Sequence, residues 1–200
     1  MASTAPPERP PRPPSDFVRR DLPLELVPAG SRFVRLHRTD LNPLFFGTAG
    51  ANRFDDPERV YGVCYVAMTL AGAFAETCLR AVGRQFVASA FLAARSVTTI
   101  EVTAPLRLVA VHGPGLARIG ATSLVSSGAP ALAQSWSRAI HEHPAAPDGL
   151  LYRASHDDSE MCGALFDRCV DRLAPVQTEG LFADRVRLAA LLDRYKVGLG

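Results

Sequence analysis

The chain has 200 residues, of which 48% are hydrophobic and 21% charged, a composition typical of one globular domain that can build an apolar core. The 22 basic and 20 acidic residues leave a formal net charge of +2, which gives little attraction to phosphate backbones and disfavours a nucleic-acid partner. No apolar stretch approaches the ~18 residues that span a bilayer, and the first residues lack the apolar segment of a secretory signal. We therefore expect a cytoplasmic protein with no membrane partner.

Residues 1–15, MASTAPPERPPRPPS, are rich in proline and contain no aromatic or branched aliphatic side chain. Such a segment cannot bury enough surface to offset the entropy of ordering it. We predict a disordered tail over residues 1–15 and a folded domain over residues 16–200. A proline-rich ligand for another protein is the alternative for the tail.

The first predicted elements of the domain are two strands separated by a loop. Residues 31–39 alternate loosely and place Phe33, Arg35 and His37 on one face of a strand. Residues 47–57 are a loop rich in Gly, Asn, Asp and Pro. The next segment, YGVCYVAM, is apolar on both faces, which predicts a central strand over residues 61–68 that is covered on both sides.

A helix is predicted after this strand, over residues 70–82, with Thr69 as its N-cap and Gly83 as its stop. Glu76 lies away from the centre of its apolar stripe. That stripe consists of Leu70, Phe74, Cys78 and Ala81.

The remaining segments alternate between strands and helices without a regular βαβ order. We predict strands over residues 97–103, 106–111 and 150–155, and we favour a strand over a short helix at 162–166. Apolar residues at helical spacing, including Trp136, predict a helix over residues 131–143.

A last helix, capped by Asp184, is predicted over residues 184–196. Its inward positions are predicted to be Val186, Ala189, Leu192 and Tyr195. Because strands outnumber long helices in the middle of the chain, the fold class is α+β rather than doubly wound.

Several familiar sites are absent from the sequence. It contains no phosphate loop, dinucleotide fingerprint, nucleophile elbow or H-E-x-x-H zinc motif. His141 and His143 are two positions apart, so their rings diverge on a helix, and we interpret them as an exposed helix end. No C-x-x-C pair occurs among the four cysteines, which we interpret as small buried residues rather than a metal site. They are Cys64, Cys78, Cys162 and Cys169.

What remains is a set of polar residues inside or beside apolar elements: Arg35, Arg53, Tyr65, Glu76 and Ser155. A charge next to a core must be paired or exposed, because an isolated ion in a low dielectric is costly. Taken singly, each has an ordinary structural explanation. Glu76 could pair with Arg80 four residues on, Tyr65 could be a core aromatic and Ser155 a cap.

Four stretches, read together and in order, resemble a known family. The first is FVRLHR, an arginine-bearing strand that is followed by PLFFG. The second, NRFDDPERVYG, matches a Gly-Arg-aromatic-Asp/Asn signature. CYVAMTLAGAFAE matches a Leu-Tyr-Leu-Ala segment followed by a helix that ends in Ala-x-x-Glu, and DGLLYRAS matches Gly-Leu-x-Tyr-x-Ser. From residue 32 to residue 168 the chain resembles the RES-domain family, which is named for Arg, Glu and Ser.

The resemblance implies a compact ADP-ribosyltransferase-like domain, α+β with a mostly antiparallel sheet and flanking helices. Characterised members degrade NAD+ with water or phosphate as the attacking group, and several are toxins neutralised by a partner antitoxin. We therefore expect an NAD+ glycohydrolase or phosphorylase with NAD+ as substrate and inorganic phosphate as an alternative co-substrate. An antitoxin protein is the expected partner, and no bound prosthetic cofactor or metal is expected.

Residue by residue, the resemblance assigns the catalytic set to Arg53, Tyr65, Glu76 and Ser155, and adds Arg35 as a second arginine of the first strand. Cleavage of the nicotinamide–ribose bond builds positive charge on the ribose, which Glu76 would stabilise. Arg35 and Arg53 would bind the pyrophosphate or an incoming phosphate. Tyr65 would pack against the nicotinamide riboside, and Ser155 would donate to a phosphate or ribose oxygen.

Two alternatives of other classes stay open at this point. One is a non-catalytic RES-like module that binds a nucleotide or a protein. The other is an ADP-ribosyltransferase that modifies a macromolecule.

Overall fold

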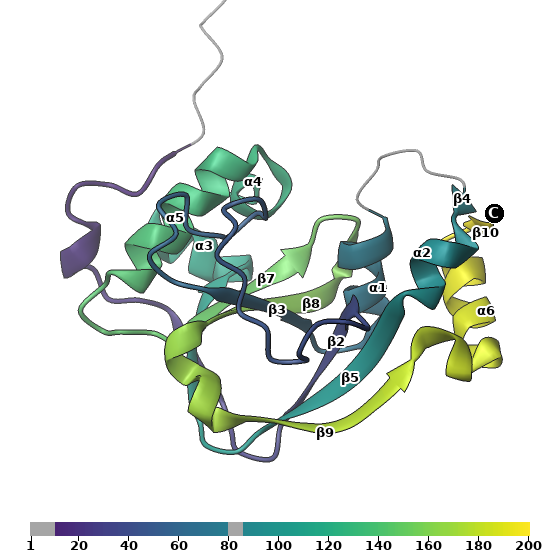
Figure 1. Cartoon of the computed structure of the whole chain (residues 1–200). Helices are drawn as coiled ribbons and strands as arrows, with labels where there is room; N and C mark the ends of the chain where they lie inside the picture. Colours follow the sequence, from purple (N-terminus) through teal and green to yellow (C-terminus); the bar gives the residue numbers. More distant parts are fainter. Residues whose placement is uncertain (1–10, 80–85) are drawn as a thin grey trace, which may run out of the picture.

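The computed structural model describes residues 11–79 and 86–200, which form one domain around an eight-stranded sheet (Figure 1). Within this sheet, every neighbouring pair of strands is antiparallel except β6 and β7, which are parallel. The predicted α+β class with a mostly antiparallel sheet is therefore confirmed. In spatial order the strands are β1 (Leu24–Val27), β6 (Leu106–Val111), β7 (Gly149–Ala154), β8 (Asp157–Phe166), β3 (Val63–Ala67), β2 (Arg32–Arg38), β5 (Arg95–Val102) and β9 (Leu173–Gly180).

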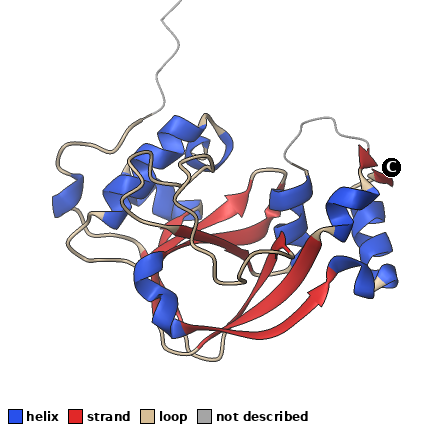
Figure 2. Ribbon diagram, viewed as in Figure 1, coloured by secondary structure: helices blue, strands red, loops and turns tan. Residues whose placement is uncertain are grey.

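The helices gather on one side of the curved sheet (Figure 2). They are α1 (Leu70–Cys78), α2 (Ser89–Ala93), α3 (Gly113–Ile119), α4 (Leu124–Ser127), α5 (Pro130–His141) and α6 (Arg185–Arg194). Three 3-10 helices, η1 (Phe17–Arg19), η2 (Asp167–Arg172) and η3 (Leu181–Ala183), and a short parallel pair, β4 (Phe86–Val87) with β10 (Gly198–Leu199), complete the fold. Among the described residues, no helix is both long enough and apolar enough to cross a bilayer.

The sheet has an apolar cluster on each face, and β3 contributes to both. Val63 and Ala67 belong to the larger cluster under the helices, and Tyr65 packs against it. Cys64 and Val66 belong to the smaller cluster on the opposite face. This alternation confirms the predicted central strand, because a strand covered on both faces is apolar at consecutive positions.

Helix α1 follows β3 directly and begins where the sequence predicts. The side chain of Thr69 accepts a hydrogen bond from the backbone N of Gly72, as an N-cap does. Phe74 and Cys78 are buried in the larger cluster. The predicted stop at Gly83 lies outside the described residues.

The predicted inward face of α6 is wrong in part. Val186 is 82% exposed, and Ala189 is exposed too, whereas Leu188 and Leu191 are buried in the larger cluster. The predicted cap at Asp184 is confirmed, since its side chain accepts from the backbone N of Arg187. The helix offers two overlapping apolar stripes, and the stripe with the larger leucine side chains is buried because it removes more apolar area from water.

The N-terminal segment packs against α5. Trp136 is fully buried, as predicted for a core residue, and its ring meets Phe17 edge-on with centroids 5.4 Å apart. The Trp136 indole N donates to the carbonyl of Pro11, so contact with the domain reaches back into the segment predicted as a tail. Residues 1–10 of that tail lie outside the described residues.

The prediction of an exposed helix end at His141 and His143 is wrong. His143 is buried and packs edge-on against Phe17, with ring centroids 5.6 Å apart. The His141 ring stacks on Tyr61 at 3.8 Å, and burial lowers the pKa of His141. Both contacts join segments distant in the chain, which local spacing does not reveal.

Candidate active site

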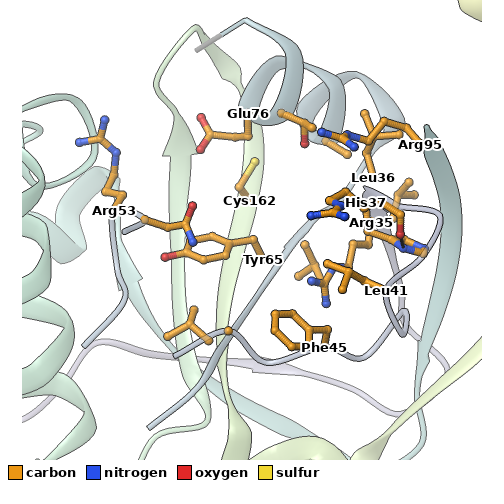
Figure 3. A pocket seen from close by; sticks show the side chains of 18 of the residues that line it. Arg35, Leu36, His37, Leu41, Phe45, Arg53, Tyr65, Glu76, Arg95 and Cys162 are labelled. Atoms are coloured by element: carbon orange, nitrogen blue, oxygen red, sulfur yellow. Dashed lines mark hydrogen bonds between the residues drawn. The ribbon is translucent and has the colours of Figure 1, made fainter. Parts of the chain in front are cut away.

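A cavity of about 640 Å³ opens where β2 and β3 separate (Figure 3). These neighbours pair at one position, Val34 with Ala67, and then diverge. Five consecutive residues of β2, 34–38, line the cavity together with β3, α1 and the loop before β3. All five residues singled out in the sequence lie on its wall: Arg35, Arg53, Tyr65, Glu76 and Ser155.

Glu76 is held from two sides at this cavity. Its Oε1 accepts from the backbone N of Ser155 at 2.8 Å, and its Oε2 accepts from the hydroxyl of Tyr152 at 3.2 Å. Burial, and then the charge of Glu76, raise the pKa of Tyr152 well above its ordinary value, so this hydroxyl stays protonated and donates. The carboxylate is therefore fixed in orientation. The alternative partner Arg80 lies outside the described residues.

Arg53 lies across the cavity from Glu76, on the loop that precedes β3 (Figure 3). Its Nη1 donates to the carbonyl of Gly128 at 2.6 Å, just after α4. The side-chain amide of Gln134 on α5 donates to the carbonyls of Gly50 and Asn52, which anchors the same loop. The loop is thus attached to the helical layer at several points.

Tyr65 joins that loop to the sheet. Its ring lines the cavity, while its hydroxyl accepts from the backbone N of Phe54 and donates to Asp55, both at 2.9 Å. The explanation of Tyr65 as a mere core aromatic is incomplete, because it is only partly buried and both hydrogen bonds engage the loop that carries Arg53. Its hydroxyl group therefore anchors the loop that carries Arg53, while its ring lines the cavity.

Ser155 and Arg35 each bridge two segments. The hydroxyl of Ser155 donates to the carbonyl of Ser126 in α4 at 2.6 Å, while its backbone N serves Glu76. Arg35 is 9% exposed, and its Nη1 donates to the carbonyl of Pro43 at 2.8 Å and contacts the sulfur of Cys64. Arg35 therefore links β2 to Cys64 of β3, beyond the position where the two strands pair. It also lines the cavity.

Asp55 and Tyr152 are site residues that the sequence analysis missed. Asp55 is fully buried, and its Oδ2 accepts from the backbone N atoms of Ala51 and Asn52 and from the Asn52 side chain. An aspartate two residues after Arg53 in a Gly/Asn loop is a signal for such local bonds. Tyr152 was visible only as one letter of the DGLLYRAS motif.

The cavity wall is predominantly cationic. Among the described residues that line it, Arg35, Arg38, Arg53 and Arg95 carry positive charge and Glu76 is the one carboxylate. A pocket with this balance favours an anionic ligand that places a developing positive charge at one carboxylate.

The cysteines are buried, and none is in a disulfide. Cys162 lies on the cavity wall, where burial and then the charge of Glu76 raise its pKa. The thiol therefore stays protonated and is a poor nucleophile. The described residues contain no cluster of three His, Cys, Asp or Glu side chains suited to a metal ion.

Comparison with known proteins agrees with the resemblance. Probable toxin y4kH of Sinorhizobium fredii (strain NBRC 101917 / NGR234) is 30% identical over 103 residues, which cover 51% of this chain and 80% of that relative. The structure of the M. tuberculosis MbcT–MbcA toxin–antitoxin complex contains a chain of similar fold, with a TM-score of 0.61 at 15% identity over 77% of this chain and 85% of that one. This likeness confirms the predicted α+β fold. The RES domain model matches residues 31–187, and the chain therefore belongs to the RES domain family.

Proposed function

We propose that this chain cleaves the nicotinamide–ribose bond of NAD+ and transfers the ADP-ribosyl group to water or inorganic phosphate. The observation that carries the proposal is the Glu76 carboxylate, held by Ser155 and Tyr152 at one side of a cavity whose other charged residues are arginines. A carboxylate fixed before the substrate arrives stabilises developing positive charge without paying to reorganise.

The reaction breaks the bond between the ribose C1′ and the pyridinium nitrogen, and the electron pair leaves with nicotinamide, which departs neutral. Positive charge then develops on the ribose, as in an oxocarbenium ion. Glu76 stabilises this charge and orients the 2′-hydroxyl or the incoming group. A water or phosphate oxygen forms the new bond to C1′, and a water molecule that attacks releases its proton to solvent. A neutral leaving group needs no strong general acid.

The arginines supply the binding. Arg53 lies across the cavity from Glu76, and its guanidinium is permanently charged and suited to phosphate oxygens. This group donates to the carbonyl of Gly128, a neutral acceptor that a pyrophosphate oxygen outcompetes because a charge-assisted bond is stronger. The Tyr65 ring offers a flat face for the nicotinamide end.

The direct test is to incubate the purified protein with NAD+, with and without phosphate, and to separate nicotinamide, ADP-ribose and its 1″-phosphate. We expect nicotinamide release, and the ratio of the two sugar products distinguishes hydrolase from phosphorylase. Glu76→Gln should lose at least about 100-fold in kcat, the scale of one lost electrostatic group. Glu142→Gln, an exposed glutamate paired with Arg138, is the matched control and should retain full activity.

Intact NAD+ in both incubations with folded protein would refute the proposal, as would full turnover by the Glu76→Gln variant. Calorimetric binding of NAD+ without nicotinamide release would instead identify a non-catalytic nucleotide-binding module. Transfer of label from NAD+ to a protein or nucleic acid would identify an ADP-ribosyltransferase.

We further propose that the chain is the toxin of a toxin–antitoxin pair, with a partner protein that blocks the cavity. The similarity to a relative named as a probable toxin supports this. Expression of the wild type in a bacterial host should deplete NAD+ and arrest growth, and Glu76→Gln should do neither. Growth arrest by the inactive variant would contradict the proposed cause of toxicity.

A further inference from the structure

The cavity is longer than the reacting end of the substrate needs. It follows β2 over residues 34–38, a distance of about 13 Å at ~3.3 Å per residue. In Figure 3, Arg53, Tyr65 and Glu76 lie on one side, and Arg35, His37 and Arg95 lie on the other. The proposed reaction uses the first side, so the second remains to be explained.

The second side contains a flat platform at the start of β5. Phe91 of α2 and Arg95 of β5 both line the cavity, and the guanidinium carbon of Arg95 lies 4.1 Å from the centroid of the Phe91 ring. Both side chains are half-buried. A phenyl ring and a guanidinium plane are the surfaces on which protein sites stack nucleobases.

This side also carries positive charge suited to a phosphate. Arg38 and Arg95 are cross-strand partners in the register of β2 and β5. Asp40 pairs with Arg38, so the three arginines Arg35, Arg38 and Arg95 leave this end of the cavity with a net positive charge. The pKa of His37 at this end is lowered first by burial and then by the charges of Arg35 and Arg95. Its ring Nδ1 bonds to the carbonyl of Arg38 and its Nε2 bonds to the hydroxyl of Thr98, so the ring is fixed in position.

We propose that Phe91 and Arg95, with Arg38 at the rim, form the subsite for the adenosine 5′-phosphate half of the substrate. The adenine stacks on the Phe91–Arg95 platform, and the phosphate lies toward the arginines of β2. The proposal rests on the proposed function, and it makes the enzyme selective for a dinucleotide over nicotinamide mononucleotide, which lacks this half.

The test compares steady-state kinetics on NAD+ and on nicotinamide mononucleotide for the wild type, Arg95→Gln and Phe91→Leu. Removal of a base-stacking group typically costs about 1–3 kcal/mol, so we expect KM for NAD+ to rise by about 5- to 140-fold. Because neither residue touches the reacting atoms, kcat should change by less than about twofold. The kcat/KM for the mononucleotide should be unchanged.

Arg32→Gln is the matched control. Arg32 lies on the same β2–β5 ladder, but it pairs with Glu101 and is not part of the cavity wall. This variant should behave as the wild type on both substrates. Thermal unfolding of each variant checks that the fold is retained.

Equal effects of Arg95→Gln and Phe91→Leu on both substrates, or an unchanged KM for NAD+, would overturn the subsite. A calorimetric titration with AMP tests it without turnover. The wild type and Arg32→Gln should bind AMP, and Arg95→Gln should bind at least about fivefold more weakly, the low end of the expected stacking loss. If the wild type cleaves neither substrate, the proposed reaction fails, while AMP binding alone then supports or overturns the subsite.

Discussion

Substitution of Asp55 separates the positioning of Arg53 from direct contact with the substrate, because Asp55 touches no proposed substrate atom. Its buried carboxylate accepts from the backbone N of Ala51 at 3.1 Å, from two donors of Asn52 and from the hydroxyl of Tyr65. These bonds hold the loop that carries Arg53. Asp55→Asn keeps the size of the side chain and removes its charge and one acceptor oxygen.

The cost follows from the bonds that change. Three donors converge on Oδ2 of Asp55, and hydrogen bonds to a charged group contribute about 1 kcal/mol more than neutral ones. The sum of about 3 kcal/mol is reduced because Ala51 is exposed and water can satisfy its N–H. We expect the free energy of unfolding to fall by about 2–3 kcal/mol. A loosened Arg53 should also raise KM for NAD+ by about tenfold, the equivalent of one weakened phosphate contact.

The matched control is Asp56→Asn. Asp56 is equally buried and accepts from the backbone N atoms of Glu58 and Val60, in the turn that follows the Arg53 loop. The free energy of unfolding of Asp56→Asn, measured in urea, should fall by a comparable amount, but this variant should keep the wild-type KM for NAD+. If Asp55→Asn leaves KM unchanged, or if both variants alter KM equally, Asp55 is a structural residue only and does not position Arg53.

Three further predictions concern the pH response, the carboxylate and the core. Burial lowers the pKa of His37 in the folded chain, so as the pH falls below about 6.5 the unfolded chain takes up a proton before the folded chain does. The free energy of unfolding in urea should therefore fall by up to about 1.4 kcal/mol per pH unit, and parallel pH curves for wild type and His37→Gln would contradict this. Tyr152→Phe removes one bond to Glu76 and should lower kcat about tenfold in steady-state assays with little change in KM; an unchanged kcat would show that the bond does not orient the carboxylate. Leu188→Ala should cost about 2–4 kcal/mol, whereas Val186→Ala, on the exposed side of the same helix, should stay within about 0.5 kcal/mol in thermal unfolding.

The elements that the sequence predicted well are those with local causes. The strand after residue 61 and the helix after Thr69 follow from an apolar run and a cap, and both are present as β3 and α1. Where two local patterns overlap, as in α6, the choice between them depends on the surface that the helix meets. That surface comes from distant parts of the chain, and the buried face of α6 was therefore predicted incorrectly.

The candidate site divides in the same way. Arg53, Tyr65 and Glu76 were identified because each is polar within or beside an apolar element and falls in a family motif. Tyr152 was missed because its role exists only in the hydrogen bond to a residue 76 positions away. The roles of such positioning residues are defined by the pairing of β3, β7 and β8, which local sequence patterns do not specify.

The divergence of β2 from β3 has a consequence for how the protein could adapt. Strands β3, β7 and β8 with their loops carry the parts that would act on the ribose, and β2 with β5 carries those that would hold the rest of the ligand. Since β2 and β3 share one backbone pair beside the contact of Arg35 with Cys64, the side chains of β2 and β5 that face the cavity can vary without altering the two hydrogen bonds that hold Glu76. A fold of this kind can change the molecule it recognises while conserving the bond it breaks.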